Sequence, residues 1–339
     1  MTITTAPLAL SRPRRRRHVL VSIMLWLITL LVLAWAVVRL GGWEQGPVVQ
    51  VFAFTPYAAA GSMLPVLIAL IAGRWLTAAV AAMAMAMLVV CVLPRALANH
   101  NRGPVSGVAV HVLTGNMLAG AADPATIVAL VRDNDVSVLA LQEYTGGAKA
   151  ALTAAGLDQV LPYSSLGLPR DSDSFGTTGS ALYSRFPITA AGVRQNGGGF
   201  QQAYGTVQPP GAGPVLVESA HPIAPYDVPV LADWRSDLAA EPVPDAGTAP
   251  RILLGDFNST LDHEPLRALI ARGYRDAADT DGKGLIGTWG PYTGQPFPPV
   301  TIDHVLVDQR IGVSHVEVHG LPRSDHRAVL ADLWLPAST

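Results

Sequence analysis

Three long apolar stretches in the first hundred residues constrain this chain more than any other feature. They are Val19–Val38, about Val49–Ala72, and Trp75–Pro94, and none of them contains a charged residue. Each is long enough to cross a hydrocarbon core of ~30 Å, which takes about 20 helical residues. We therefore predict three transmembrane helices rather than a signal peptide followed by buried helices of a soluble protein.

Basic residues predict the orientation of these helices. Arg12 and Arg14 to Arg17 precede the first stretch, and Arg74 lies in the tight turn between the second and the third. Because arginine and lysine are retained on the cytoplasmic side, the N-terminus should be cytoplasmic and residues 104–339 extracytoplasmic, at the plasma membrane. The expected parts are a basic cytoplasmic N-terminus (1–18), three transmembrane helices (19–94), a polar linker (95–104) and a folded domain (105–339).

The charge of the chain is divided between these parts. Residues 1–103 carry nine arginines and one acid, whereas residues 104–339 carry 24 acidic residues against 14 arginines and lysines. Proteins that bind duplex DNA without sequence preference rely on clustered basic residues, so nucleic acid is the less expected partner. The only cysteine, Cys91, lies in the third apolar stretch, which excludes disulfides and thiolate catalysis from the outer domain.

The outer domain reads as many strands with a few helices between them. Val108, Val110 and Val112 alternate as in a strand, Asp123-Pro124 is typical of a helix start, and Val136–Leu141 is a buried strand. Further strands are expected at Gly179–Tyr183, Pro214–Ser219, Arg251–Gly255, Ile302–Val307 and Arg327–Leu335, with a helix at Pro229–Ala240. This pattern predicts an α/β sandwich of sheets covered by helices.

Polar residues recur where these strands end, which is where a rigid scaffold presents a site. They are Asn116, Glu143, His221, Asp256 and Asn258 in Gly-Asp-Phe-Asn, Asp303, and Asp325-His326 in Ser-Asp-His. A divalent cation offsets the charge of a phosphoester, and Mg²⁺ prefers oxygen ligands such as Glu143 offers. Asp256 could deprotonate a water, and an imidazole such as His326 could stabilise the phosphate or pass a proton.

Each of these residues also has an ordinary interpretation. Asn116 is typical of a turn, and Asp256 with Asn258 could form an Asx turn. All of these ordinary interpretations would have to be true at once, for residues that occur in this order and at these strand ends. The set as a whole therefore favours a functional site. His304 lies within a strand and is interpreted as structural. No motif surrounds His111, His263, His315 or His319.

The ordered set of motifs resembles the endonuclease/exonuclease/phosphatase superfamily over roughly residues 105–336. The most specific segments are Gly255-Asp256-Phe257-Asn258 and Ser324-Asp325-His326. The resemblance implies a four-layer αββα sandwich with two mainly antiparallel sheets and dependence on Mg²⁺ or Mn²⁺.

The resemblance also implies a role for each residue. The metal ligands would be Glu143, with Asn116 beside it, and Asp325. The catalytic residues would be Asp256, which orients or deprotonates the attacking water, Asn258, which supports the phosphate, Asp303, which orients His326, and His221, as general acid or phosphate contact. Some nuclease members carry an acid two residues after the first Asn, where this chain has Leu118.

These observations lead to three hypotheses about function. The leading one is a membrane-anchored, extracytoplasmic, Mg²⁺-dependent phosphohydrolase that cleaves a phosphoester or pyrophosphate bond in a lipid-linked or small substrate. The architecture also resembles actinomycete membrane proteins linked to teicoplanin resistance, which suggests a cell-envelope substrate. The alternatives are a membrane-tethered surface nuclease and a non-catalytic membrane scaffold with a degenerate site.

Overall fold

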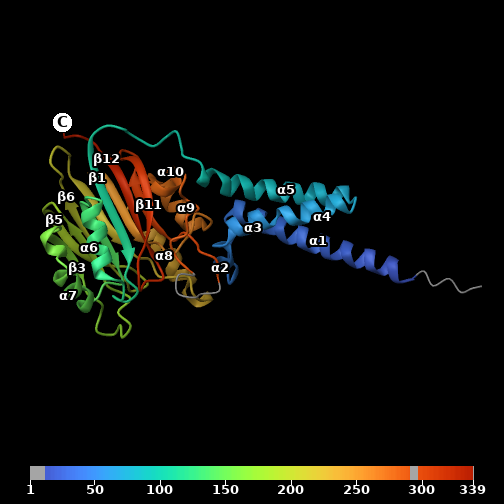
Figure 1. Ribbon diagram of the computed structural model, residues 1–339, viewed down its shortest axis with the longest axis horizontal. Coiled ribbons are helices and arrows are strands. Elements are labelled where there is room, and N and C mark those ends of the chain that lie inside the picture. The colour runs from blue at the N-terminus through green and yellow to red at the C-terminus, as the bar shows by residue number, and fades with distance from the viewer. Residues whose placement is uncertain (1–11, 291–296, 339) are drawn as a thin grey trace, which may run out of the picture. The chain divides into compact units, whose positions relative to one another are not determined.

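A computed structural model describes residues 12–290 and 297–338, which form two compact units. The helical unit comprises the described residues up to Trp43 together with Thr55–Val92. The sheet unit comprises Glu44–Phe54 and the described residues from Leu93 onward (Figure 1). The chain therefore enters the sheet unit, returns to the helical unit and enters the sheet unit again.

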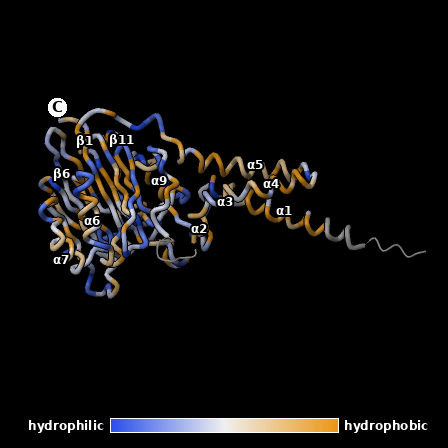
Figure 2. Tube along the Cα trace, viewed as in Figure 1, coloured by the Kyte–Doolittle hydropathy of each residue, from blue (hydrophilic) through white to orange (hydrophobic). Residues whose placement is uncertain are grey.

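The helical unit consists of α1 (Arg12–Gly41), α3 (Thr55–Gly61), α4 (Met63–Ile71) and α5 (Trp75–Val92). Within the described residues, two segments are long and apolar enough to cross a membrane, Val19–Gly41 and Trp75–Ala96. Figure 2 shows that α1, α4 and α5 are hydrophobic over most of their length. These two segments agree in position with the first and third predicted spans.

The second predicted span differs from the structure. The stretch expected at about Val49–Ala72 is divided into α2 (Val48–Phe52), α3 and α4. Only Thr55–Ile71 remains as a shorter apolar helical segment in the helical unit. Val49 and Phe52 are buried instead, and α2 belongs to the sheet unit. Hydropathy alone does not distinguish a helix that faces lipid from one that packs on a core.

The sheet unit contains two six-stranded mixed sheets, which confirms the predicted α/β class. The first, in the order β11-β12-β1-β2-β4-β3, consists of β1 (Val108–Asn116), β2 (Val138–Gln142), β3 (Tyr163–Gly167), β4 (Ser180–Ser184), β11 (Gly312–Gly320) and β12 (Arg327–Leu335). The second, in the order β5-β6-β7-β8-β10-β9, consists of β5 (Ile188–Gln195), β6 (Gln201–Val207), β7 (Val215–Ala220), β8 (Arg251–Asp256), β9 (Tyr274–Asp276) and β10 (Asp303–Asp308). Each sheet has one parallel pair, β1 with β2 and β7 with β8, and its other pairs are antiparallel.

The alternation of side chains along the strands explains the layering. Val112 of β1 and Ile252 of β8 belong to one apolar cluster that joins the two sheets. Leu113, the next residue of β1, packs with α6 (Pro124–Asp133) and α7 (Gly146–Ala154) on the outer face of the first sheet. Likewise, α8 (Leu231–Ala240) and α9 (Glu264–Ala271) pack on the outer face of the second sheet (Figure 1). The shorter helices are η1 (Leu93–Ala96), η2 (Leu157–Gln159), η3 (Val228–Val230) and α10 (Ala277–Thr280).

The segment Glu44–Phe54, here called the α2 segment, is an integral part of the second sheet's helical layer. Val49 packs in the cluster that contains Trp234 and Phe257. Its carbonyl accepts a hydrogen bond from Nε2 of His263 at 2.9 Å. The carboxylate of Glu44 accepts from the first backbone N–H of α9 at 2.5 Å, where a negative charge also favours the helix dipole.

The predicted linker 95–104 is anchored to the sheet unit at its first residue. The guanidinium of Arg95 donates two hydrogen bonds to the carboxylate of Asp262, at 2.7 and 2.6 Å. Both side chains are buried, at 6% and 0% exposed. A buried, bidentate pair of this kind holds the start of the linker next to His263 and α9.

Arg95→Ala is expected to lower the free energy of unfolding by about 3–5 kcal/mol, because it removes the cation from a buried, bidentate ion pair. Arg102→Ala breaks the more exposed pair with Asp281 and should cost less than about 1 kcal/mol. Thermal unfolding of both variants, purified in detergent, would measure the difference. Equal melting temperatures for the two variants would show that the Arg95 pair contributes no more than a surface pair.

Candidate active site

The predicted site residues gather at one end of the two sheets. Asn116 is the last residue of β1, Glu143 follows the last residue of β2, and Asp256 is the last residue of β8. Because β1 and β2 are parallel, Asn116 and Gln142 are register partners and Glu143 comes directly after them. Asp303 begins β10 and is the antiparallel partner of Asp256. The register within each sheet therefore brings residues far apart in the sequence side by side.

The side-chain amide of Asn116 joins the carboxylates of both sheets. Its Nδ2 donates to Oε1 of Glu143 at 3.1 Å and to Oδ2 of Asp256 at 3.0 Å. Its Oδ1 accepts from the backbone N–H of Leu118 at 2.9 Å. In this orientation the nitrogen of Asn116, and not its oxygen, faces the site, so the residue holds two carboxylates in a fixed relation.

Several residues around the site have left-handed backbone conformations that non-glycine residues rarely adopt. Their φ angles are 48° at Leu118, 51° at Ala119, 53° at Glu143 and 48° at Asn258. Such conformations cost of order 1–3 kcal/mol each and persist where the surroundings enforce them. Oε2 of Glu143 accepts from the backbone N–H of Ala119 at 2.7 Å, which connects two of the strained positions.

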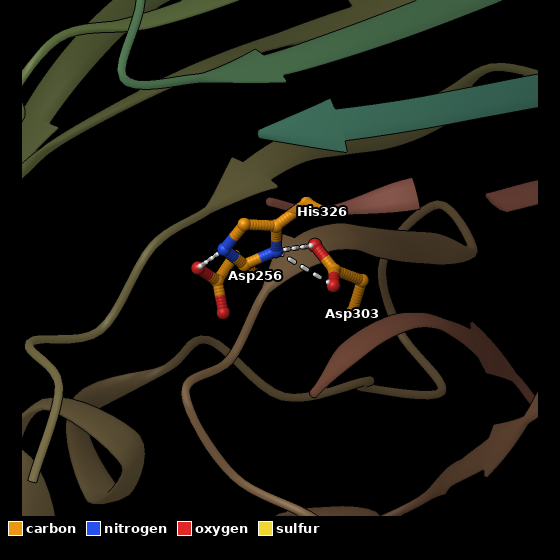
Figure 3. A group of neighbouring side chains, drawn as sticks. All are labelled: Asp256, Asp303 and His326. Atoms are coloured by element: carbon orange, nitrogen blue, oxygen red, sulfur yellow. Dashed lines mark hydrogen bonds and ion pairs between the residues drawn. The ribbon is translucent and has the colours of Figure 1, made fainter. Parts of the chain in front are cut away.

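His326 lies between two buried carboxylates (Figure 3). Its Nδ1 lies 3.2 and 3.0 Å from the two oxygens of Asp303, and its Nε2 lies 3.7 Å from Oδ2 of Asp256. Burial lowers the pKa of His326, but the carboxylates of Asp303 and Asp256 outweigh it and raise the pKa to about 10. Burial raises the pKa of Asp256 to about 7, although the charge of His326 opposes this shift. The predicted pairing of Asp303 with His326 is present in this geometry.

His221 differs from His326 in its electrostatic surroundings. It is 2% exposed, and its Nε2 lies 3.7 Å from Oδ2 of Asp256. Burial, together with the charge of His326, lowers the pKa of His221 to about 3. Its Nδ1 has no hydrogen-bond partner within residues 12–290 and 297–338. A neutral imidazole keeps one N–H that can donate a hydrogen bond, but this N–H is too weakly acidic to serve as a general acid near neutral pH. The phosphate-contact role is therefore favoured among the two predicted for His221.

Asn258 is attached to the loop that carries His221. Its backbone N–H donates to Oδ1 of Asp256 at 2.8 Å, and its Nδ2 donates to the carbonyl of Pro222 at 3.1 Å. The side-chain amide of Asn258 therefore positions the loop after His221, and its backbone N–H positions the carboxylate of Asp256.

Asp325 adds a further carboxylate beside His326. Its Oδ2 accepts from the indole nitrogen of Trp289 at 3.0 Å, and its Oδ1 lies 4.0 Å from Nε2 of His326. This Oδ1 is buried and has no hydrogen-bond partner in the described part of the chain. Trp289 did not emerge from the sequence because no recognisable motif surrounds it.

The residues present fit a divalent cation. Ligand atoms of Asp256, Asp303 and His326 lie within 4.8 Å of one another, so this buried group could hold an ion. However, the contact between Asp303 and Nδ1 of His326 would have to open for an ion to bind there. Glu143 and Asp325 provide hard oxygen donors of the type that Mg²⁺ prefers, and Oδ1 of Asp325 accepts no hydrogen bond from any residue that the structure describes.

Comparison with known proteins agrees with this geometry. The sequence profile of the Endonuclease/Exonuclease/phosphatase family matches residues 113–326, a segment that contains all eight predicted site residues. The chain belongs to this family. Members of the family are metal-dependent phosphoester hydrolases. No curated protein matches the sequence of the chain.

Solved structures of the family share the fold at low sequence identity. An endonuclease/exonuclease/phosphatase from Beutenbergia cavernae is 22% identical, with a TM-score of 0.53 over 67% of this chain and 72% of that one. Truncated TDP2 from Caenorhabditis elegans is 16% identical, with a TM-score of 0.51 over 68% of this chain and 100% of that one. A family protein from Leptotrichia buccalis is 15% identical, with a TM-score of 0.50 over 66% and 99%.

Proposed function

We propose that this protein is a membrane-anchored, Mg²⁺- or Mn²⁺-dependent phosphohydrolase that cleaves a phosphoester or pyrophosphate bond of a lipid-linked substrate outside the cytoplasm. The observation that carries the proposal is the contiguous group around Asp256, in which Asn116, His221 and His326 approach the same carboxylate. The same chain contains the long apolar helical segments Val19–Gly41 and Trp75–Ala96, which precede this group in the sequence.

The residues of the site divide the chemistry among them. Asp256 accepts the proton of the attacking water, and Asn116 together with the backbone of Asn258 keeps its carboxylate in place. His326, held by Asp303, presents a positive charge to the phosphate. Glu143 and Asp325 would hold the metal ion, while the side-chain nitrogen of Asn116, which faces the site in place of the predicted oxygen ligand, keeps the carboxylate of Glu143 in place. When bound, the ion neutralises phosphate charge and polarises the P–O bond.

The α2 segment supports a topology with three membrane crossings. It packs in the sheet unit, so it lies on the same side of the membrane as the rest of that unit. The chain between Phe54 and Leu97 must then cross an even number of times. If Trp75–Ala96 crosses, the 17-residue segment Thr55–Ile71 crosses as well. At 1.5 Å per residue this segment is about 26 Å long, a shortfall that local thinning of the bilayer accommodates.

Charge supports a small or lipid-linked substrate over duplex DNA. Residues 104–339 have a formal net charge of −10, and their only lysines are Lys149 and Lys283. A surface of this composition lacks the clustered cations that neutralise a nucleic-acid backbone. A membrane-anchored enzyme instead gains access to its substrate because both are confined to the bilayer.

The direct test is phosphate or headgroup release by the full chain, purified in detergent with Mg²⁺. Isoprenyl pyrophosphate, a phosphodiester lipid and plasmid DNA would be offered in parallel, with Asp256→Asn as the inactive control. Turnover of a lipid that is lost in the variant supports the proposal and identifies the bond type. Cleavage of DNA alone makes the protein a tethered nuclease, and absence of both turnover and Mg²⁺ binding makes it a scaffold.

Glu143→Gln is expected to weaken Mg²⁺ binding at least about 100-fold, since even residues that only support metal ligands change affinity 10–100-fold. Titration calorimetry of the full chain would measure the binding, with phosphate release measured in parallel. Glu317→Gln, a substitution of the same type at an exposed position of β11, is the matched control. Unchanged Mg²⁺ affinity in Glu143→Gln would remove Glu143 from the ligand set.

A further inference from the structure

The short helix α2 is apolar on both of its faces. Val49 and Phe52 point into the sheet unit and are 0% and 2% exposed. Val48 and Val51, one position earlier in each case, lie about 100° around the helix and are 42% and 46% exposed. A helix on the surface of a water-soluble domain normally has polar residues on its outer face, so the exposed valines of α2 are suited to an apolar partner.

A second apolar element lies against α2. The loop that follows His221 exposes Tyr226 and Val228, at 71% and 48%. Nε2 of Gln50, in α2, donates to the carbonyl of Pro225 at 2.8 Å and so joins the loop to the helix. The four side chains Val48, Val51, Tyr226 and Val228 are here called the α2 face. Their only charged close neighbour along the loop is Asp227.

We infer that the α2 face rests on the outer surface of the lipid bilayer, an inference that depends on the membrane anchoring proposed above. The path of the chain favours the bilayer as the surface that the α2 face contacts. The apolar helix α1 ends at Gly41 and the next apolar segment begins at Thr55, so the α2 segment has an apolar helix a few residues away at each end. Valines with a tyrosine are the side chains expected at such an interface.

The third crossing of the chain leads to the same region. Arg95, the penultimate residue of the apolar segment Trp75–Ala96, forms the buried pair with Asp262. His263, which follows Asp262, donates to the carbonyl of Val49. The α2 segment and Arg95, through which the chain passes between the apolar helices and the sheet unit, therefore both contact the region of Asp262 and His263. The α2 face belongs to this same region of the sheet unit.

The α2 face is also connected to the candidate active site. Tyr226 and Val228 lie on the loop that begins with His221-Pro222, and Asn258 donates to the carbonyl of Pro222. Contact of this loop with lipid places the loops of His221 and Asn258 near the headgroups. The substrate class that fits is an amphiphile whose phosphate lies at the membrane surface while its chain stays in the bilayer.

The test uses the full chain, whose single cysteine, Cys91, is replaced by serine. An environment-sensitive nitrobenzoxadiazole label is attached at Val51→Cys or Val228→Cys, and the protein is reconstituted in vesicles of phosphatidylcholine and phosphatidylglycerol. Val105→Cys and Tyr163→Cys are matched controls, because both residues are exposed and lie beside the strand ends opposite the site. Spin-labelled lipids in the bilayer act as the quencher.

Blue-shifted emission and quenching at positions 51 and 228, with water-like and unquenched emission at positions 105 and 163, is the expected result. Labels at positions 51 and 228 that behave like those at 105 and 163 would overturn the inference. Tyr226→Cys provides another position on the same loop if Val228→Cys does not fold. Because the measurement needs no turnover, it separates failure of this inference from absence of the proposed activity.

Discussion

Replacing Asp256 with asparagine is expected to lower kcat at least about 1,000-fold, within the range attributed to a positioned general base. Asp256 is the residue that Asn116, Asn258, His221 and His326 all approach. An asparagine of the same shape keeps an oxygen for the backbone N–H of Asn258 but cannot take a proton from water. The charge that faces His326 is also lost.

The measurement is kcat for phosphate release with saturating Mg²⁺ and the substrate found in the parallel assay. Asp308→Asn is the matched control, because Asp308 is a buried aspartate at the opposite end of β10 from Asp303 and pairs with Arg310. It should affect stability and leave kcat within about threefold, since a difference of that size is under 1 kcal/mol in the barrier. Comparable activity in Asp256→Asn and the unaltered chain would exclude Asp256 as the base.

Removal of residues 1–92 is expected to destabilise the sheet unit by about 5 kcal/mol. The deletion removes the buried side chains of Val49 and Phe52, and burial of such a side chain contributes about 1.5–3 kcal/mol. It also leaves His263 and the first turn of α9 without their partners in the α2 segment. A domain is stable by only about 5–15 kcal/mol in total, so the loss is at least about a third of that stability.

Chemical denaturation, followed by circular dichroism, compares the truncated chain with one in which Glu44–Phe54 is joined to Leu93 through a flexible linker. The linked segment should restore most of the lost stability. A truncated chain as stable as the linked one would show that the α2 segment packs on the sheet unit without stabilising it.

Much of the candidate site was predictable because its residues occur in short local motifs. Asp256 with Asn258, and Asp325 with His326, are recognisable over three or four residues. The strand registers place the residues of each sheet, and the hydrogen bond from Asn116 to Asp256 joins the two sheets at the site. The start of α6 was predictable for a similar reason. Asp123 accepts from the N–H of Thr126 at 2.8 Å as the N-cap, and the proline after it is typical of a first helical position.

The parts that the sequence did not predict depend on contacts between distant residues. β5 exposes much of its length, with the pattern of an edge strand, so it shows no regular apolar alternation. The α2 segment has the hydropathy of a membrane span, and only its packing against Trp234 and Phe257 distinguishes it. The amide orientations of Asn116 and Asn258, and the neutral state of His221, follow from their neighbours in three dimensions.

The place of the α2 segment in the core also has a consequence for biosynthesis. Val49 leaves the ribosome early, yet its hydrogen-bond partner His263 follows 214 residues later, and domains generally fold as units during synthesis. The α2 segment is outside the membrane in the proposed topology, but it cannot pack in its native position until α9 has been exported. An incomplete nascent chain cannot assemble this corner of the domain, so we expect α2 docking to be among the last steps of maturation.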